Sequence, residues 1–198
     1  MKWICHRVNT KEDLEMVPAE YGVELDIRDH WDGRIYIQHH PFQKGEDFEE
    51  YLKVYRHGIM IVNVKSERIE LKARELLERY QIEDYFFLDS SFPMIRLLAD
   101  LGEKRMALRY SEWEGMDTIR RMAGQVNWIW VDCFTKLPLT KADYLEMKQL
   151  GYQVCLVSPE LQGQEEKIEL YRRQIEEEGI ELDAVCSKIY NIERWRKK

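Results

Sequence analysis

Short apolar segments alternate with amphipathic helical stretches along this chain, and this alternation constrains the fold more than any other sequence feature. Eight such segments occur, at residues 3–6, 22–28, 59–65, 85–89, 106–109, 128–133, 153–157 and 184–186. Strands joined by helices run parallel, and eight repeats predict an α/β protein of the (β/α)8 TIM-barrel type. A doubly wound open sheet is the alternative, but its glycine-rich phosphate loop is absent after the first strand.

A further apolar segment, from Ile35 to His39, interrupts this alternation. It follows the second strand after only residues 28–34, which contain Asp32-Gly33. Such a connection is too short for a parallel crossover, so the segment is expected to fold back as an antiparallel hairpin. The expected barrel is therefore small, with a hairpin extension after its second strand.

The size and composition predict one domain that spans residues 1–198, since 44% hydrophobic residues suffice for one sizeable core. A net charge of −7 argues against non-specific nucleic-acid binding and against anionic membrane surfaces. The chain has neither a signal-peptide pattern nor an apolar run of transmembrane length, so we expect a cytoplasmic protein with no membrane insertion. Four cysteines lie inside apolar segments without CxxC spacing and are expected to be buried and reduced: Cys5, Cys133, Cys155 and Cys186. The oligomeric state stays open.

Local signals mark several helix ends. Thr10 with Asp13, and Thr140 with Asp143, have the spacing of capping boxes. One long amphipathic helix is expected from about residue 160 to residue 178, with a charged face in solvent.

Two carboxylates in the second strand are the main indication of chemistry. Glu24 and Asp26 alternate with Val23, Leu25 and Ile27, so both project from one face of the strand. If that face is buried, the pair needs a counter-charge, and a divalent cation supplies it most economically. The alternative places both on the solvent face of a half-exposed antiparallel strand.

Four basic residues lie near the ends of neighbouring segments: Arg7, Arg28, His39 and His40. They favour a buried functional site around the two carboxylates over an exposed strand face. A cation on the carboxylates can bind a phosphoryl oxygen, positive side chains can offset the remaining charge, and two histidines can exchange protons. This combination suits phosphodiester cleavage. Asp132, close to a strand end, is a further candidate polar contact.

Three motifs occur in a characteristic order: His6-Arg7-Val8, then Glu24-Leu25-Asp26, then Asp32-Gly33 followed by His39-His40. This order resembles the glycerophosphodiester phosphodiesterase family, within the wider set of barrels similar to phosphatidylinositol-specific phospholipase C. The corresponding family motifs are His-Arg-Gly, Glu-x-Asp, Asp-Gly and His-Asp. The similarity covers nearly the whole chain in order and spacing, and its specific motifs lie in the first third.

The resemblance implies a metal-dependent hydrolase of a small glycerol- or sugar-type phosphodiester, with one Mg²⁺ or Ca²⁺ as cofactor. In such enzymes a neighbouring hydroxyl of the substrate attacks phosphorus, and water then opens the cyclic phosphate. The resemblance implies that His6 and His39 are catalytic, as general base and general acid. It implies that Arg7 and Lys65 bind phosphate. The implied metal ligands are Glu24, Asp26 and Asn63. His40 is the alternative to His39.

Three positions depart from the family pattern. Val8 replaces a glycine, His40 an aspartate, and Asn63 the third acidic ligand of a Glu-x-Lys motif whose Lys65 is retained. An amide oxygen is a weaker ligand than a carboxylate for hard cations. The sequence therefore leaves two further classes of function open. One is a non-catalytic barrel that binds a phosphorylated ligand. The other is an interaction module, which only the basic residues 194–198 support.

Overall fold

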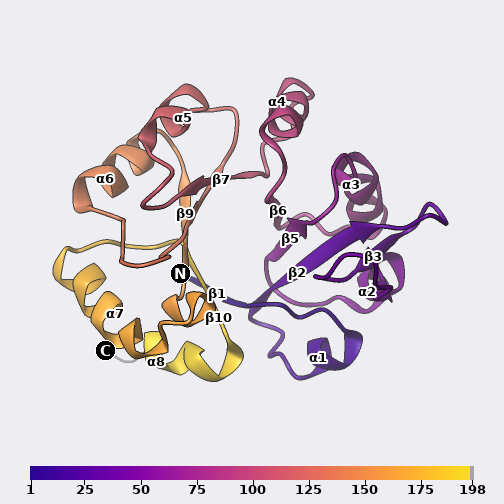
Figure 1. The fold of residues 1–198 in the computed structure, drawn as a ribbon, viewed down its shortest axis with the longest axis horizontal. Coiled ribbons are helices and arrows are strands. Elements are labelled where there is room, and N and C mark those ends of the chain that lie inside the picture. The colour runs from indigo at the N-terminus through magenta and orange to yellow at the C-terminus, as the bar shows by residue number, and fades with distance from the viewer. Residues whose placement is uncertain (197–198) are drawn as a thin grey trace. The chain divides into compact units, whose positions relative to one another are not determined.

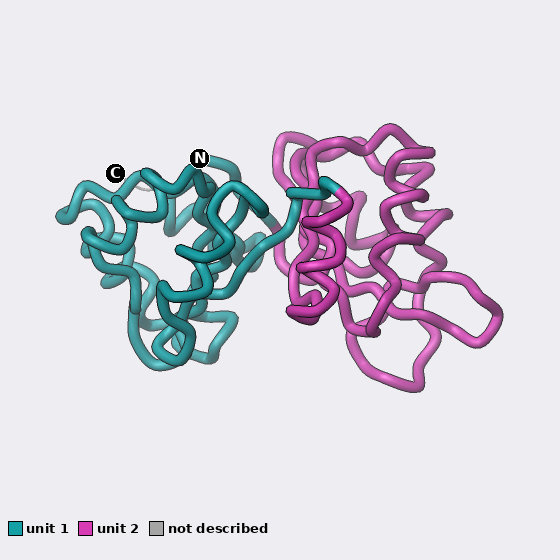
Figure 2. The backbone as a smooth tube through the Cα atoms, turned by 90° about the horizontal axis from the view of Figure 1, so that it is seen from above, with its two compact units in different colours: residues 1–4, 102–198 teal, residues 5–101 magenta. Residues whose placement is uncertain are grey.

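The computed structural model describes residues 1–196, and the last two residues of the expected basic tail, Lys197 and Lys198, lie outside the described part. Two compact units make up the chain (Figure 2). One contains Cys5–Leu101, and the other contains Met1–Ile4 with the chain from Gly102 onward. The first strand, β1 (Lys2–Cys5), contributes residues to both.

The unit formed by Cys5–Leu101 is built on three parallel strands, β2 (Gly22–Asp29), β5 (Met60–Val64) and β6 (Tyr85–Leu88). Its helices are α1 (Lys11–Glu15), α2 (Phe48–Val54), α3 (Glu70–Arg79) and α4 (Phe92–Asp100). Asp26 pairs with Asn63 across β2 and β5, and Asn63 pairs with Leu88 across β5 and β6. This register brings the carboxyl ends of all three strands to one edge (Figure 1).

The expected hairpin is confirmed. β3 (Ile35–Ile37) runs antiparallel to β2, with Ile27 opposite Ile37, and β4 (Glu46–Asp47) pairs with β3. The turn depends on Gly33, whose φ of 78° lies in the left-handed region that glycine tolerates best. Its N–H donates to the carbonyl of His30 at 2.9 Å. The hairpin therefore places His39 and His40 just beyond the end of β3.

The other unit repeats the strand–helix order with β7 (Ala107–Tyr110), β8 (Trp128–Val131), β9 (Gln153–Val157) and β10 (Ala184–Ser187), which run parallel. Its helices are α5 (Met116–Arg121), α6 (Lys141–Gln149), α7 (Ile168–Glu177) and α8 (Ile192–Arg196). Three short 3₁₀ turns, η1 (Pro159–Gln162), η2 (Glu165–Lys167) and η3 (Ile189–Asn191), complete it.

The expectation of one helix over residues 160–178 is wrong at its beginning. Gly163 adopts a left-handed conformation with φ of 74°, which ends η1 and prevents a continuous helix. The α-helix starts only at Ile168. The N-caps of the predicted capping boxes are confirmed, because the hydroxyls of Thr10 and Thr140 accept from the N–H groups three residues on, at 2.9 and 3.1 Å. In each case the threonine hydroxyl also donates to the aspartate, at 2.7 Å.

The strands form the cores of both units and are buried along nearly their whole length. The four cysteines are free and buried, as expected, and burial raises the pKa of the Cys5 thiol to about 12. Within residues 1–196, no helix combines the length and apolar character needed to cross a membrane.

Candidate functional site

The two carboxylates of β2 are buried rather than solvated, and the alternative that placed them on an exposed strand face is wrong. Glu24 and Asp26 are each 1% exposed. β5 pairs with one edge of β2 and the hairpin strand β3 with the other, so β2 is an inner strand of the sheet rather than a half-exposed antiparallel strand. Two buried carboxylates on one face require positive or hydrogen-donating neighbours.

Glu24 receives hydrogen bonds on both oxygens. The backbone N–H of Arg7 donates to Oε2 at 2.7 Å, and Nδ2 of Asn63 donates to Oε1 at 2.7 Å. Nε2 of His6 lies 3.7 Å from Oε2. Arg7 has φ of 57°, an uncommon conformation for a residue with a side chain, and this tight turn after β1 directs its N–H at the carboxylate. Val8 has no positive φ, so the turn does not need the glycine of the family pattern there.

Asp26 is held by an asparagine that sequence reasoning missed. Asn9 donates from Nδ2 to Oδ2 of Asp26 at 2.9 Å, and its Oδ1 accepts the backbone N–H of Asp26 at 3.0 Å. Nε of Arg7 and Nζ of Lys65 each lie 3.7 Å from the Asp26 carboxylate. No spacing signal marks Asn9, because its role depends on how the turn after β1 folds over β2.

Burial and the neighbouring charge of Asp26 raise the pKa of Glu24 from its ordinary value of 4.5 to about 7. The hydrogen bonds from Asn63 and from the Arg7 backbone, together with the charge of Lys65, oppose this rise. Negative charge in the pair is therefore only partly compensated by the protein's own groups.

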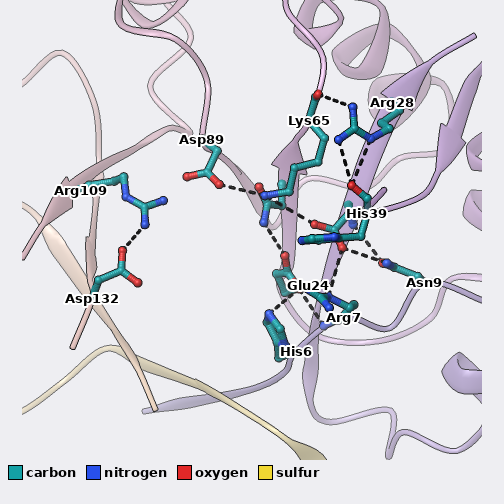
Figure 3. A network of polar contacts seen from close by, with 12 residues as sticks. His6, Arg7, Asn9, Glu24, Arg28, His39, Lys65, Asp89, Arg109 and Asp132 are labelled. Carbon is teal, nitrogen blue, oxygen red and sulfur yellow. Dashed lines mark hydrogen bonds and ion pairs between the residues drawn. The ribbon is translucent and has the colours of Figure 1, made fainter. Parts of the chain in front are cut away.

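His39 lies in the same cluster, shown in Figure 3. Burial lowers the pKa of its imidazole, and the charges of Arg7 and Lys65 act in the same direction, while Asp26 acts against them. His40 is exposed and its ring meets that of His39 edge-on, with centroids 4.8 Å apart. The His39 side chain is directed toward the carboxylates (Figure 3), and it is less exposed than His40.

Lys65 follows β5 and links Asp26 to a second carboxylate. Its Nζ donates to Oδ2 of Asp89 at 3.0 Å. Asp89 follows β6 with φ of 61°, a left-handed conformation that aspartate adopts more readily than most residues. A cavity of about 320 Å³ lies beside this pair, and its lining is mostly polar: Val64, Lys65, Ser66, Glu67, Asp89 and Ser91.

Arg28, on the same strand face as the carboxylates, contacts backbone rather than acid. Its guanidinium donates to the carbonyl oxygens of His39 and Lys65. Its position near a strand end was visible in the sequence, but these two acceptors were not.

In the other unit, Asp132 is 1% exposed and accepts a hydrogen bond from Arg109 at the end of β7. Gln162 donates to its second oxygen at 3.3 Å. Asp132 is thus bonded by side chains of its own unit, and a contact with a ligand stays a prediction.

The chemistry of the donor set suits one divalent cation. Glu24 and Asp26 offer hard carboxylate oxygens, the preferred ligands of Mg²⁺ and Ca²⁺. Oδ1 of Asn63 is buried without a hydrogen-bond partner. Within the described residues, no group of three or more His, Cys, Asp or Glu side chains is arranged to hold a metal, so the third ligand would be this amide.

No protein-family profile matches the sequence, and no curated protein sequence matches it. Solved structures match its fold. A glycerophosphodiester phosphodiesterase from Agrobacterium tumefaciens str. C58 aligns with a TM-score of 0.66 and 16% identity, over 95% of this chain and 97% of that chain. A glycerophosphoryl diester phosphodiesterase from Parabacteroides distasonis ATCC 8503 aligns with a TM-score of 0.69 and 13% identity, over 98% and 85% respectively. The chain therefore has the fold of these two phosphodiesterases, the small α/β (β/α)8 TIM barrel with a hairpin after its second strand.

Proposed function

We propose that this protein, as one barrel domain over residues 1–198, hydrolyses a small glycerol- or sugar-type phosphodiester. The observation that carries the proposal is the buried pair Glu24 and Asp26, surrounded by His6, Arg7 and Lys65 within 3.7 Å. The fold shared with two phosphodiesterases supports the same reaction class.

Arg7 and Lys65 bind the phosphate in this proposal. Both already lie against Asp26, and their side chains are 41% and 19% exposed, so each can still reach a ligand. An anionic phosphodiester brought to this cluster gains charge-assisted hydrogen bonds from both. Their charges also stabilise the additional negative charge that develops on phosphorus oxygens in the transition state.

His6 and His39 transfer protons. Glu24 lies beside His6 and Asp26 acts electrostatically on His39, so each imidazole has a carboxylate that can stabilise its protonated form. The lowered pKa of His39 makes its imidazolium a stronger acid, which suits the general-acid role implied for this residue. One ring takes the proton of the attacking hydroxyl, the other protonates the leaving alcohol, and the roles reverse when water opens the cyclic phosphate.

A single Mg²⁺ or Ca²⁺ would be held by Glu24, Asp26 and the amide oxygen of Asn63. When bound, it supplies Lewis-acid stabilisation of phosphoryl oxygens. The protein's own groups orient the phosphate and move the protons.

The test is hydrolysis by the purified full chain of several glycerol- and sugar-type phosphodiesters, with Mg²⁺, Ca²⁺, Mn²⁺ or a chelator. We expect turnover that a chelator abolishes. His40→Ala is the matched control for His39→Ala, because its ring neighbours His39 but is exposed, and it should keep most of the activity.

A second candidate is a barrel that binds a phosphorylated ligand without turning it over. The amide of Asn63, which donates to Glu24 where the family pattern has an acid, favours it. Saturable binding of phosphodiesters without turnover, under every cation condition, would support this candidate and exclude the enzyme.

A further inference from the structure

The guanidinium of Arg28 joins two separate backbone segments of the candidate site. Nε and Nη2 donate to the carbonyl oxygen of His39 at 3.2 and 2.9 Å, and Nη1 donates to the carbonyl oxygen of Lys65 at 2.8 Å. His39 follows β3 and Lys65 follows β5, the strands on either side of β2. One side chain thus bridges both neighbours of its own strand (Figure 3).

These two carbonyls lie where the sheet ladder ends. The N–H of Gln38 still donates to the carbonyl of Asp26 at 2.8 Å, and the N–H of Lys65 to that of Ile27 at 2.9 Å. Beyond these bonds the flanking segments leave β2, and their next partly buried carbonyls need donors from elsewhere. The planar fork of an arginine has several N–H groups in fixed directions and can reach both acceptors at once.

Arg28 forms no ion pair in the part of the chain that the structure describes. Within residues 1–196, none of the carboxylates lies within 4.0 Å of its side-chain nitrogens, whereas Arg7 and Lys65 both contact Asp26. All of its polar contacts go to backbone carbonyls, so its contribution is geometric rather than compensation of a neighbouring acid.

We infer that Arg28 is a positioning residue that fixes the backbone of His39 and Lys65, and so sets where the imidazole and the ammonium group stand relative to Glu24 and Asp26. The catalytic part of this inference rests on the proposed function; the structural part does not. Removal of the guanidinium should loosen residues 38–42 and 65–67 together, although they are far apart in sequence.

The first test is amide hydrogen exchange in Arg28→Ala, with Arg34→Ala as control. Arg34 lies on the same hairpin, but its side chain is 67% exposed, and its one ion pair among the described residues is with Asp47. We expect exchange at residues 38–42 and 65–67 to accelerate by about tenfold or more in Arg28→Ala, with the protein otherwise folded, and to stay unchanged in Arg34→Ala. Equal exchange in the two variants would overturn the inference.

The second test is kinetic. A misplaced acid–base group mainly lowers kcat, so Arg28→Ala should lose on the order of 10²-fold in kcat while KM changes by less than about threefold. Added guanidinium ion at millimolar concentration should restore part of the loss. A rise in KM at constant kcat would contradict positioning, because it would mean that Arg28 binds substrate directly.

Arg28→Lys covers the case in which Arg28→Ala does not fold. A lysine keeps the charge but lacks the planar fork, so it should bond only one of the two carbonyls and accelerate exchange in only one of the two segments. Wild-type exchange throughout Arg28→Lys would contradict the inference. A wild-type protein without turnover would instead overturn the proposed function, while the exchange experiment would still decide the role of Arg28.

Discussion

Nδ2 of Asn63 donates a 2.7 Å hydrogen bond to Oε1 of Glu24. An amide thus stands on β5 opposite the buried pair, where a third carboxylate would add negative charge. Without a cation, the Asn63 amide stabilises the cluster. Burial and the charge of Asp26 both disfavour a negative charge on Glu24, and the hydrogen bond from Asn63 offsets part of this effect. In the proposed cation site, the same amide would supply one neutral ligand.

Asn63→Asp should increase the affinity for a divalent cation and make the stability of the fold depend on that cation. The nearly isosteric carboxylate adds a hard ligand, but without a cation it repels Glu24 and Asp26. We expect tighter Mg²⁺ or Ca²⁺ binding by calorimetry, and a lower Tm in chelator that the cation restores.

The matched control for this variant is Gln43→Asp. It adds the same charge at an exposed position of the same unit and should change neither quantity. No cation binding in the wild type and no gain in Asn63→Asp would remove the metal from the proposal.

The contribution of Glu24 to stability should decrease as pH rises. Its pKa is about 7 in the folded chain and 4.5 ordinarily, so between these values the native state binds more protons than the unfolded state. The contribution is therefore present below about pH 4.5 and lost through pH 7. Denaturant unfolding of the wild type and of Glu24→Gln, in chelator, measures it. As pH rises from about 4.5 to 7, the unfolding free energy of the wild type should fall relative to that of Glu24→Gln. Parallel pH profiles of the two proteins would refute the assigned pKa.

Lys65→Met should weaken phosphate binding. Its ammonium group lies between Asp26 and Asp89 and is 19% exposed, so it can donate to a ligand oxygen. A hydrogen bond to a charged group is worth about 1.5–3 kcal/mol, which corresponds to a loss of roughly tenfold to a hundredfold in affinity. Lys53→Met is the control, since Lys53 pairs with Glu50 on the surface of α2. Equal affinities of the two variants for inorganic phosphate would exclude Lys65 from the binding site.

Much of the fold follows from local patterns. The strand–helix order, the hairpin at Gly33 and the shared face of Glu24 and Asp26 depend on spacing within single segments, and the sequence contains that spacing. The break at Gly163 was missed, because an isolated glycine does not reveal its φ.

The partners within the site were less predictable. Asn9, Arg28 and Asp89 contact partners that lie 11 to 37 residues away along the chain. These contacts depend on the geometry of turns and strand ends. Such pairings arise from strand register and loop conformation rather than from sequence spacing. Arg28 in particular contacts backbone carbonyls, which carry no sequence signal at all.

In the proposed function, His6 and His39 act together in phosphodiester hydrolysis. The most direct measurement is turnover of one glycerol-type phosphodiester by four purified proteins in the same cation buffer: wild type, His6→Ala, His39→Ala and the double variant. We expect each single change to lower kcat by about 10²-fold or more, and the double change to lower it little further, because the pair acts as a unit. Turnover by the wild type that both single variants and the double variant retain would contradict it.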